Sequence, residues 1–268
     1  MGSVCQMELG LKGRRALVTA ASRGLGRASA LALAAEGARV AVAGRNKAAM
    51  QDLLAELKQA GAADAIAVQM DLTDRATLKP AVDEVVAKFG GLDIFVGNTG
   101  GPEAGPFLSV SREGWERALN ESLLPLVDLS HAVLPHMQAG KWGRIIFVTT
   151  VGVKVVQPNM VLSDSVRLAV VGLAKSLSIE FAHEGIMVNC LCPGPFATDR
   201  MEYLVKSSME IEGLDRAAAE KLWLEEVPAG KFGNPDDFGA MVAMLASERA
   251  GFITGTAIAL DGGKSRAY

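Results

Sequence analysis

Two threonine hydroxyl groups follow a short apolar run near the middle of the sequence. The run Ile145-Ile146-Phe147-Val148 predicts a buried parallel strand that ends in Thr149-Thr150. Gly152 and Pro158 break the chain after it, and a helical pattern starts near Asn159. An open α/β sheet places its chemistry where the tip of a strand faces a helix across a short loop. Residues 144–178 are therefore the stretch in which we expect the reacting groups.

A second candidate site is the loop that joins the first predicted strand to the first predicted helix, Thr19-Ala20-Ala21-Ser22-Arg23-Gly24-Leu25-Gly26. Glycines let the backbone approach a pyrophosphate, and the start of a helix supplies free amides and a partial positive charge. The position of this loop, between a strand and a helix, favours a dinucleotide site over the plain tight turn that glycines also form.

The end of the second predicted strand indicates which dinucleotide would bind. It reads Gly44-Arg45-Asn46 and carries no acidic residue. An acid there would hold a bare ribose diol, whereas an arginine accommodates a 2′-phosphate. Arg23 would supply a second guanidinium group. We therefore expect NADP(H) to be favoured over NAD(H); the alternative is that both arginines are merely solvated surface residues.

Several motifs, taken in order, resemble those of the short-chain dehydrogenase/reductase family. The first loop resembles the family's Thr-Gly-x-x-x-Gly-x-Gly segment, with Ala20 in place of the first glycine. Asp71-Leu72 resembles the pair that contacts adenine, and residues 97–100 resemble the family's Asn-Asn-Ala-Gly motif. Residues 193–198 resemble the Pro-Gly segment that holds the nicotinamide end. The resemblance runs from about Leu11 to Gly263 and is nearest to 3-oxoacyl-carrier-protein reductase-like members.

The resemblance implies a set of cofactor-binding positions and a set of catalytic positions. The cofactor set is Thr19, Ser22, Arg23, Gly24, Leu25, Gly26, Arg45, Asn46, Asp71, Leu72, Asn98, Thr99, Gly100, Pro193, Gly194, Phe196 and Thr198. The catalytic set is Ser122, Thr150, Ser163 and Arg167, where the family has Asn, Ser, Tyr and Lys. Thr150 keeps a hydroxyl group. A serine hydroxyl at 163 is a far weaker acid than a phenol, and Arg167 stays cationic but cannot give up a proton as a lysine can.

By this resemblance we expect an NADP(H)-dependent oxidoreductase with an altered active site that acts on a carbonyl or alcohol substrate. Its proton would come from water or from a lid segment at about 199–227, which carries Tyr203; Glu103 is a second possible source. Two alternatives stay open. One is a catalytically silent nucleotide-binding regulatory protein, because all four catalytic positions have changed. The other is a non-redox lyase, because halohydrin dehalogenases carry an arginine at the position of Arg167.

The elements that must hold these residues are strands alternating with helices, which predicts one doubly wound parallel sheet of the Rossmann type flanked by helices on both faces. No linker divides the chain, so residues 1–268 are expected to form one domain. The predicted strands are 15–19, 40–43, 65–70, 92–97, 145–148, 186–191 and 256–260. The predicted helices are 24–36, 47–60, 74–89, 111–137 with a kink at Pro125, one from 159, 200–227 and one that Asn234 caps.

Composition excludes several classes of protein. The formal charge of −3 gives no footprint for nucleic acid, and no apolar run approaches the roughly 18 residues of a membrane span. The N-terminal residues do not resemble a secretory signal. We expect Cys190 and Cys192 to point to opposite faces of their strand, and so expect no disulfide, no metal site and a cytoplasmic protein. The apolar content of the two long helices, including Leu126, Leu129, Val170 and Leu173, predicts a homodimer or homotetramer.

Overall fold

One parallel sheet forms the centre of the protein, and the computed structural model describes it within residues 8–266. Residues 1–7 and 267–268, which include Cys5 and Tyr268, lie outside the described residues. The strands are β1 (Arg15–Thr19), β2 (Arg39–Gly44), β3 (Asp64–Gln69), β4 (Ile94–Gly97), β5 (Gly143–Val148), β6 (Ile186–Pro193) and β7 (Ala257–Leu260). Their order is β3-β2-β1-β4-β5-β6-β7, and every neighbouring pair is parallel. The predicted doubly wound fold is confirmed.

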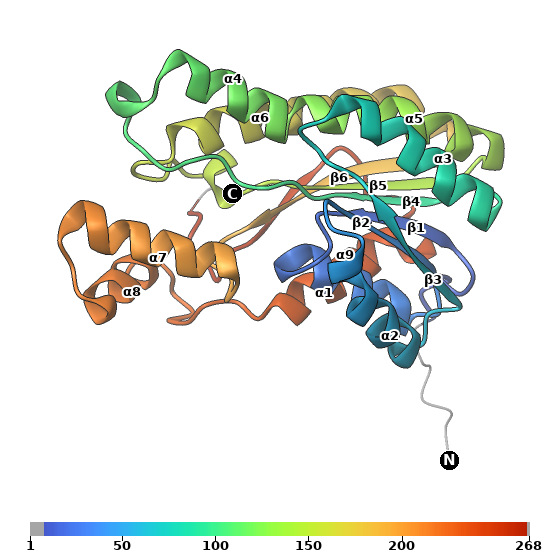
Figure 1. The fold of residues 1–268 in the computed structure, drawn as a ribbon, viewed down its shortest axis with the longest axis horizontal. Coiled ribbons are helices and arrows are strands. Elements are labelled where there is room, and N and C mark those ends of the chain that lie inside the picture. Colours follow the sequence, from blue (N-terminus) through green and yellow to red (C-terminus); the bar gives the residue numbers. More distant parts are fainter. Residues whose placement is uncertain (1–7, 267–268) are drawn as a thin grey trace.

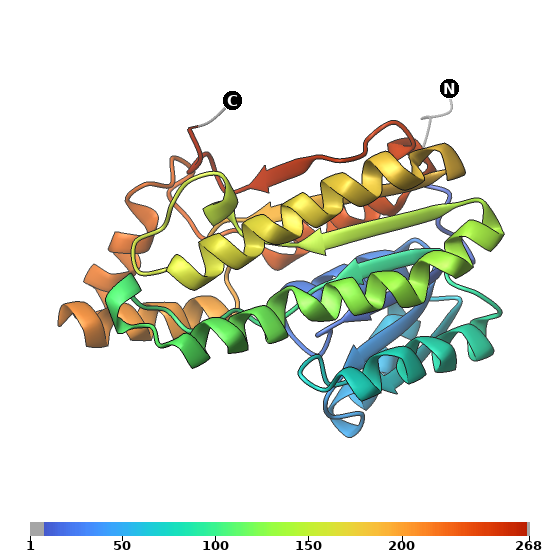
Figure 2. The same ribbon diagram turned by 90° about the horizontal axis from the view of Figure 1, so that it is seen from above.

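Helices cover both faces of this sheet (Figure 1). One layer contains α1 (Gly24–Ala35), α2 (Gln51–Ala60) and α9 (Pro235–Ala246), and the other contains α3 (Leu78–Phe89), α5 (Leu124–Gly140) and α6 (Val161–Phe181). The remaining helices, α4 (Arg112–Ser122), α7 (Asp199–Glu212) and α8 (Arg216–Leu224), extend past the carboxyl ends of the strands, as Figure 2 shows from above. No described helix is both long enough and apolar enough to cross a membrane.

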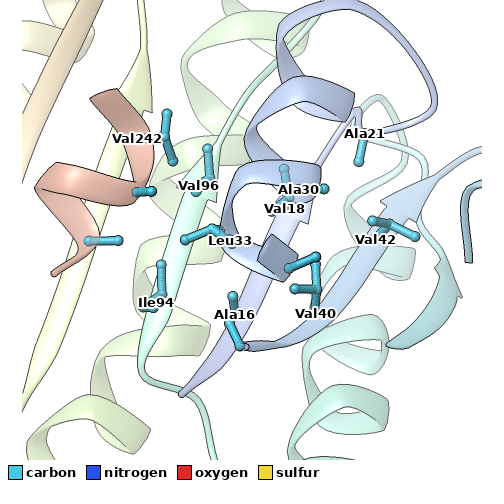
Figure 3. Packing of buried hydrophobic residues seen from close by; sticks show 14 of the residues in the cluster. Ala16, Val18, Ala21, Ala30, Leu33, Val40, Val42, Ile94, Val96 and Val242 are labelled. Atoms are coloured by element: carbon cyan, nitrogen blue, oxygen red, sulfur yellow. The ribbon is translucent and has the colours of Figure 1, made fainter. Parts of the chain in front are cut away.

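Successive side chains of each strand point to opposite faces of the sheet, and this alternation produces the two core layers. In β1, Val18 packs in the cluster under α1 and α9, whereas its neighbour Leu17 packs in the cluster under α3 and α5. Figure 3 shows the first cluster, with Leu33 of α1 lying over the side chains of β1, β2 and β4. Because successive side chains point to opposite faces, strands with both faces covered read as unbroken apolar runs.

The expectation for the cysteines was wrong in one respect. Cys190 and Cys192 are both buried in the cluster under α3, α5 and α6, because residues two positions apart on a strand point to the same face. Both are free thiols. Burial raises the pKa of each, so they behave as small apolar core residues.

The long helix predicted over 111–137 is two helices. The chain leaves α4 at Leu123, where φ is −106° and ψ is −57°, and Pro125 lies at the start of α5. Proline has no N–H for an intrahelical bond, and its ring would clash with the carbonyl four residues earlier, which belongs to Glu121. The break therefore falls on the helical turn that carries Glu121 and Ser122.

The helical segment predicted over 200–227 is also divided. Helix α7 ends at Glu212 and is capped by Gly213, whose φ of 66° favours a glycine; the Asp215 side chain then accepts a hydrogen bond from the Ala218 amide at the start of α8. The predicted cap of α9 is confirmed, since Asn234 Oδ1 accepts a hydrogen bond from the Asp236 amide.

The residues on which the assembly prediction was based pack inside this chain instead. Leu126, Leu129 and Val170 are fully buried, and Leu173 packs against the same cluster. They therefore give no support to an interface between copies.

Candidate functional site

A cleft of about 770 Å³ lies at the carboxyl ends of the strands, where the chain after β1 crosses to one face of the sheet and the chain after β4 crosses to the other. This is the place where open α/β sheets bind their ligands. Seventeen of the twenty-one predicted site residues line the cleft: Ser22, Arg23, Gly24, Leu25, Arg45, Asp71, Leu72, Asn98, Thr99, Gly100, Thr150, Ser163, Arg167, Pro193, Gly194, Phe196 and Thr198. The other four, Thr19, Gly26, Asn46 and Ser122, do not line it. The structure thus brings the two predicted sites into one space.

Two of those four residues support the loops that do line the cleft. Thr19 Oγ1 donates to the Asn98 carbonyl at 2.6 Å and accepts from the Asn98 amide at 2.9 Å, which ties the ends of β1 and β4 together. Ser122 is fully buried, and its Oγ donates to the Gly100 carbonyl at 3.5 Å. Asn46 is exposed beside Arg45.

The start of α1 presents free backbone amides to the cleft. Arg23 occupies the N-cap position with extended backbone, and its side chain makes no capping hydrogen bond. The first amides of a helix have no partner within the helix, and Gly24 and Leu25 face the cleft. This arrangement fits a dinucleotide pyrophosphate, because the amides and the helix dipole both favour an anion there.

Close packing explains the glycine at position 26. A Cβ at Gly26 would lie 2.5 Å from the Ala20 carbonyl oxygen and 2.8 Å from Asn98 Nδ2. The turn that carries Ala20 and the end of β4 therefore approach α1 as closely as atoms allow. Gly26 therefore does not line the cleft but allows α1 to pack closely against the loop that does.

Ala20 holds a backbone conformation that an alanine rarely adopts, with φ at 46°. The left-handed region costs an L-residue with a Cβ about 1–2 kcal/mol. We expect Ala20→Gly to raise the free energy of unfolding by about 1 kcal/mol. This is the strain that the glycine relieves, reduced by the conformational entropy that it adds to the unfolded chain. Urea denaturation measures this change. Ala21→Gly is the matched control: it removes a fully buried methyl group without relieving strain and should destabilise the protein. Equal effects of the two changes would contradict the account.

Charged groups surround the adenosine end of the cleft. Arg45 is exposed at the end of β2 and close enough to Asp71 to help lower the pKa of that carboxyl, although the larger cause is the hydrogen bond from the Thr73 amide. Arg23 forms a 3.2 Å ion pair with Asp199 of α7. Both partners are mostly exposed, so the pair adds little stability, but it joins the phosphate loop to the predicted lid.

The two predicted catalytic hydroxyl groups line the cleft beyond the phosphate loop. Thr150 Oγ1 accepts a hydrogen bond from the Gly152 amide at 3.2 Å, which leaves the hydroxyl proton free to donate. Ser163 lies on the first turn of α6, is 6% exposed, and makes no side-chain hydrogen bond to any described residue. Two hydroxyl groups thus come from the end of β5 and from α6.

Arg167 lies one turn after Ser163 and is almost completely buried. Its guanidinium group donates to the carbonyls of Val148 at 2.9 Å and Gly100 at 2.8 Å, and so links the ends of β5 and β4. No acidic residue in the described part of the chain forms an ion pair with it. Burial lowers the pKa of Arg167 to about 10, and the positive charge of Arg200 adds to this effect. The group remains charged at neutral pH.

The structure separates the residues considered as proton sources. Tyr203 lines the cleft from α7, whereas Glu103 does not line it and forms a 3.1 Å ion pair with Arg117. Asp164, which follows Ser163, points away from the cleft as expected, and its Oδ2 accepts a hydrogen bond from the Gln157 amide at 2.9 Å. Burial raises the pKa of Asp164.

Sequence reasoning missed three charged residues of the cleft, Glu121, Asp199 and Arg200. Glu121 directly precedes Ser122, and Arg200 is the second residue of α7, close behind Thr198. Their place beside predicted positions was the signal. Local patterns do not reveal that they face the cleft, since Glu121 lies at the end of α4 and Arg200 is held by a hydrogen bond to the distant Pro102 carbonyl.

Comparison with known proteins gives a consistent result. The sequence profile of the family described as Enoyl-(Acyl carrier protein) reductase matches residues 19–265. The chain is 33% identical over 252 residues to the 3-oxoacyl-[acyl-carrier-protein] reductase FabG of Staphylococcus aureus, covering 93% of this chain and 97% of that protein. It is also 33% identical to the 2-keto-3-deoxy-L-fuconate dehydrogenase of Xanthomonas campestris over 257 residues, covering 95% of this chain and 81% of that one.

Solved structures agree with the sequence relatives. YwfH, described as an NADPH-dependent reductase involved in bacilysin biosynthesis, superposes with a TM-score of 0.90 at 28% identity, covering 96% of this chain and all of that one. The L-sorbose reductase of Gluconobacter frateurii, solved with NADPH and L-sorbose, gives a TM-score of 0.91 at 25% identity, covering 98% and 100%. The chain belongs to the short-chain dehydrogenase/reductase superfamily of oxidoreductases, which act on carbonyl and alcohol groups, and within it is 3-oxoacyl-[acyl-carrier-protein] reductase-like.

Proposed function

We propose that this protein is an NADP(H)-dependent reductase or dehydrogenase with an altered active site. The observation that carries the proposal is the single cleft in which free helix amides and Arg45 lie at one end and Thr150, Ser163 and Arg167 at the other. The nicotinamide cofactor, when bound, would supply or accept the hydride. Related proteins described as NADPH-dependent or solved with NADPH support this choice of cofactor.

Each residue has a task in this proposal. The first amides of α1 hold the pyrophosphate, and Arg45 holds the 2′-phosphate. Thr150 and Ser163 donate hydrogen bonds to the substrate oxygen, and Arg167 places a positive charge close to it, which favours the negative charge that develops on that oxygen. Water or Tyr203 delivers the proton, since neither hydroxyl group is a strong enough acid.

The choice of cofactor can be tested through Arg45. NADPH should bind at least about tenfold more tightly than NADH, because a charge-assisted hydrogen bond contributes about 1.5–3 kcal/mol. Calorimetry on the parent protein and on Arg45→Ala measures the preference, which the substitution should abolish. Lys47→Ala, which removes a nearby exposed cation paired with Glu84, is the control. Unchanged preference in Arg45→Ala would contradict the role of Arg45.

Turnover is tested by following NADPH oxidation against a panel of carbonyl compounds. Cofactor-dependent reduction of any member supports the proposal. Tight NADPH binding with no turnover across the panel and in the reverse direction would instead favour the silent nucleotide-binding protein. Loss of halide or water from a substrate without any change in nicotinamide absorbance would favour the lyase.

We further propose that residues 1–268 act as one domain and that segment 199–227 acts as its lid.

We also propose that the protein forms a homodimer or homotetramer. Exposed apolar side chains on α6 support this assembly: Leu168 is 55% exposed and Ile179 is 74% exposed. Light scattering at micromolar concentration should give a mass of two or four chains. Leu168→Glu with Ile179→Glu should lower that mass, since it places charge in the proposed interface. A monomeric parent protein would refute the assembly.

A further inference from the structure

Two arginine side chains reach the substrate end of the cleft without acidic partners. Arg167 donates only to backbone carbonyls. Arg200 donates to the Pro102 carbonyl at 2.7 Å, and no described acid forms an ion pair with it. By contrast, Arg23, at the phosphate end, is paired with Asp199. Burying a cation without a counter-charge is costly, so the two arginines keep a positive charge that a ligand can neutralise.

The Arg200 side chain is held in a fixed place rather than free in solvent. Its guanidinium group lies 4.9 Å from the centre of the Tyr203 ring, and a Cβ on Gly101 would lie only 2.9 Å from its Nε. Gly101 and Pro102 lie in the loop after β4, so Arg200 joins α7 to the loop that borders the cleft. Burial lowers its pKa. A guanidinium group fixed in this way is prepared to bind a planar anion with little loss of side-chain entropy.

The charges that line this part of the cleft decide the valence of the ligand. Arg167 and Arg200 contribute two positive charges. Glu121 also lines the cleft and forms no ion pair with a described residue. The balance of one positive charge fits a single negative charge on the ligand. A carboxylate matches both this charge and the fork of a guanidinium group, whereas a phosphate carries more charge than the balance offers.

We propose that the substrate of this protein is an oxo acid, or the corresponding hydroxy acid, whose carboxylate binds Arg200 within the positive field of Arg167. The inference rests on the proposed function, because Thr150 and Ser163 would hold the carbonyl group that accepts the hydride. It adds that the second anchor of the substrate is an anionic group. Arg167 then serves as a positioning charge rather than as a replacement for a proton-transferring lysine.

The first test measures binding without turnover. The probe is oxamate, a carboxylate that mimics an oxo acid, titrated by calorimetry into protein saturated with NADPH, so that the phosphate sites are filled. Oxamide, which has the same skeleton without the charge, is the paired probe. Oxamate should bind at least about tenfold more tightly than oxamide. Equal affinities, or no oxamate binding, would overturn the proposal, and this comparison needs no variant protein.

The second test assigns the binding to Arg200. Arg200→Gln should weaken oxamate binding about tenfold or more, while the NADPH dissociation constant stays within about twofold of the parent value. The oxamate affinity of Arg200→Lys should lie between those of the parent protein and Arg200→Gln. Arg112→Gln, which removes an exposed arginine of α4 outside the cleft, should leave oxamate binding unchanged. Parent-like oxamate binding by Arg200→Gln would overturn the assignment. So would a loss of NADPH affinity as large as the loss for oxamate, since Arg200 would then serve the cofactor.

A third measurement separates this inference from the proposed function. NADPH oxidation is followed with 3-oxobutanoate and with its methyl ester. A preference for the acid that falls about tenfold in Arg200→Gln supports both. Reduction of the ester as fast as the acid would keep the reductase and reject the anionic substrate. Arg200-dependent binding of oxamate without reduction of any carbonyl compound would keep the anion site and reject the reductase.

Discussion

The double variant Ser163→Tyr with Arg167→Lys should reduce a simple diketone with NADPH about a hundredfold faster than the parent protein. General acid catalysis contributes roughly 10²–10⁴ in rate, and positions 163 and 167 lie one turn apart on the face of α6 that lines the cleft. The new phenol would therefore enter the same space as the Thr150 hydroxyl. Single-turnover kinetics at saturating NADPH measure the gain.

Two features of the structure place this gain at the low end of the range. Arg167 holds the Val148 and Gly100 carbonyls with separate arms of its guanidinium group, and a lysine cannot reach both in that geometry. Ser122 is buried behind Gly100 and offers no support for a relay water at the cleft. The restored pair would thus work in loops that are less firmly held.

A matched control isolates the hydroxyl group of the new tyrosine. Ser163→Phe with Arg167→Lys adds the same ring and the same cation but no acidic proton, so it should show no gain. A gain shared by both double variants would mean that filling the cleft, and not proton donation, causes the effect. A parent protein that already turns over such substrates at ordinary enzyme rates would refute the view that its site is impaired. Tyr203→Phe would then show whether the lid supplies the proton.

The strands and the functional residues at their ends were predictable because a sheet covered on both faces needs strands of consecutive apolar residues, which are visible in the sequence. Each central strand is an apolar run, and the residue types that follow it, such as Thr149-Thr150 after β5, stand at the carboxyl edge whatever the rest of the chain does. Ala20 has a left-handed backbone conformation. The family has a glycine at this position, and the loop imposes the backbone angle of that glycine on the alanine.

What sequence patterns missed depends on packing between distant segments. The break at Leu123 arises because Pro125 starts a helix instead of bending one, and propensity alone does not distinguish these outcomes. Arg200 faces the cleft because its guanidinium group meets Gly101 and Pro102, about a hundred positions earlier. No periodicity in residues 199–227 encodes that contact. The fold was therefore more predictable than the charge balance of the site.

Among substitutions that add one methyl group at the cofactor end of the cleft, Gly26→Ala should cause the largest loss of stability and of NADPH affinity. The added Cβ would meet the Ala20 carbonyl oxygen at 2.5 Å, and that oxygen belongs to backbone that cannot rotate aside. Either α1 moves away from the sheet or the phosphate loop opens. We expect a loss of about 1–3 kcal/mol in the free energy of unfolding and at least a tenfold loss of NADPH affinity, because the amides of α1 no longer lie at their proper distance from the pyrophosphate.

Gly140→Ala is the matched control for this prediction. Gly140 is the exposed last residue of α5, and a Cβ there would meet nothing within 4 Å. An alanine inside a helix is favoured over a glycine by about 0.5–1 kcal/mol, so this substitution should stabilise the protein and leave NADPH affinity unchanged. Urea denaturation and a fluorescence titration with NADPH measure both quantities on both variants. If Gly26→Ala kept the cofactor affinity of the parent protein, the close approach of α1 to the Ala20 turn would not shape the phosphate site, and the helix amides would lose their assigned task.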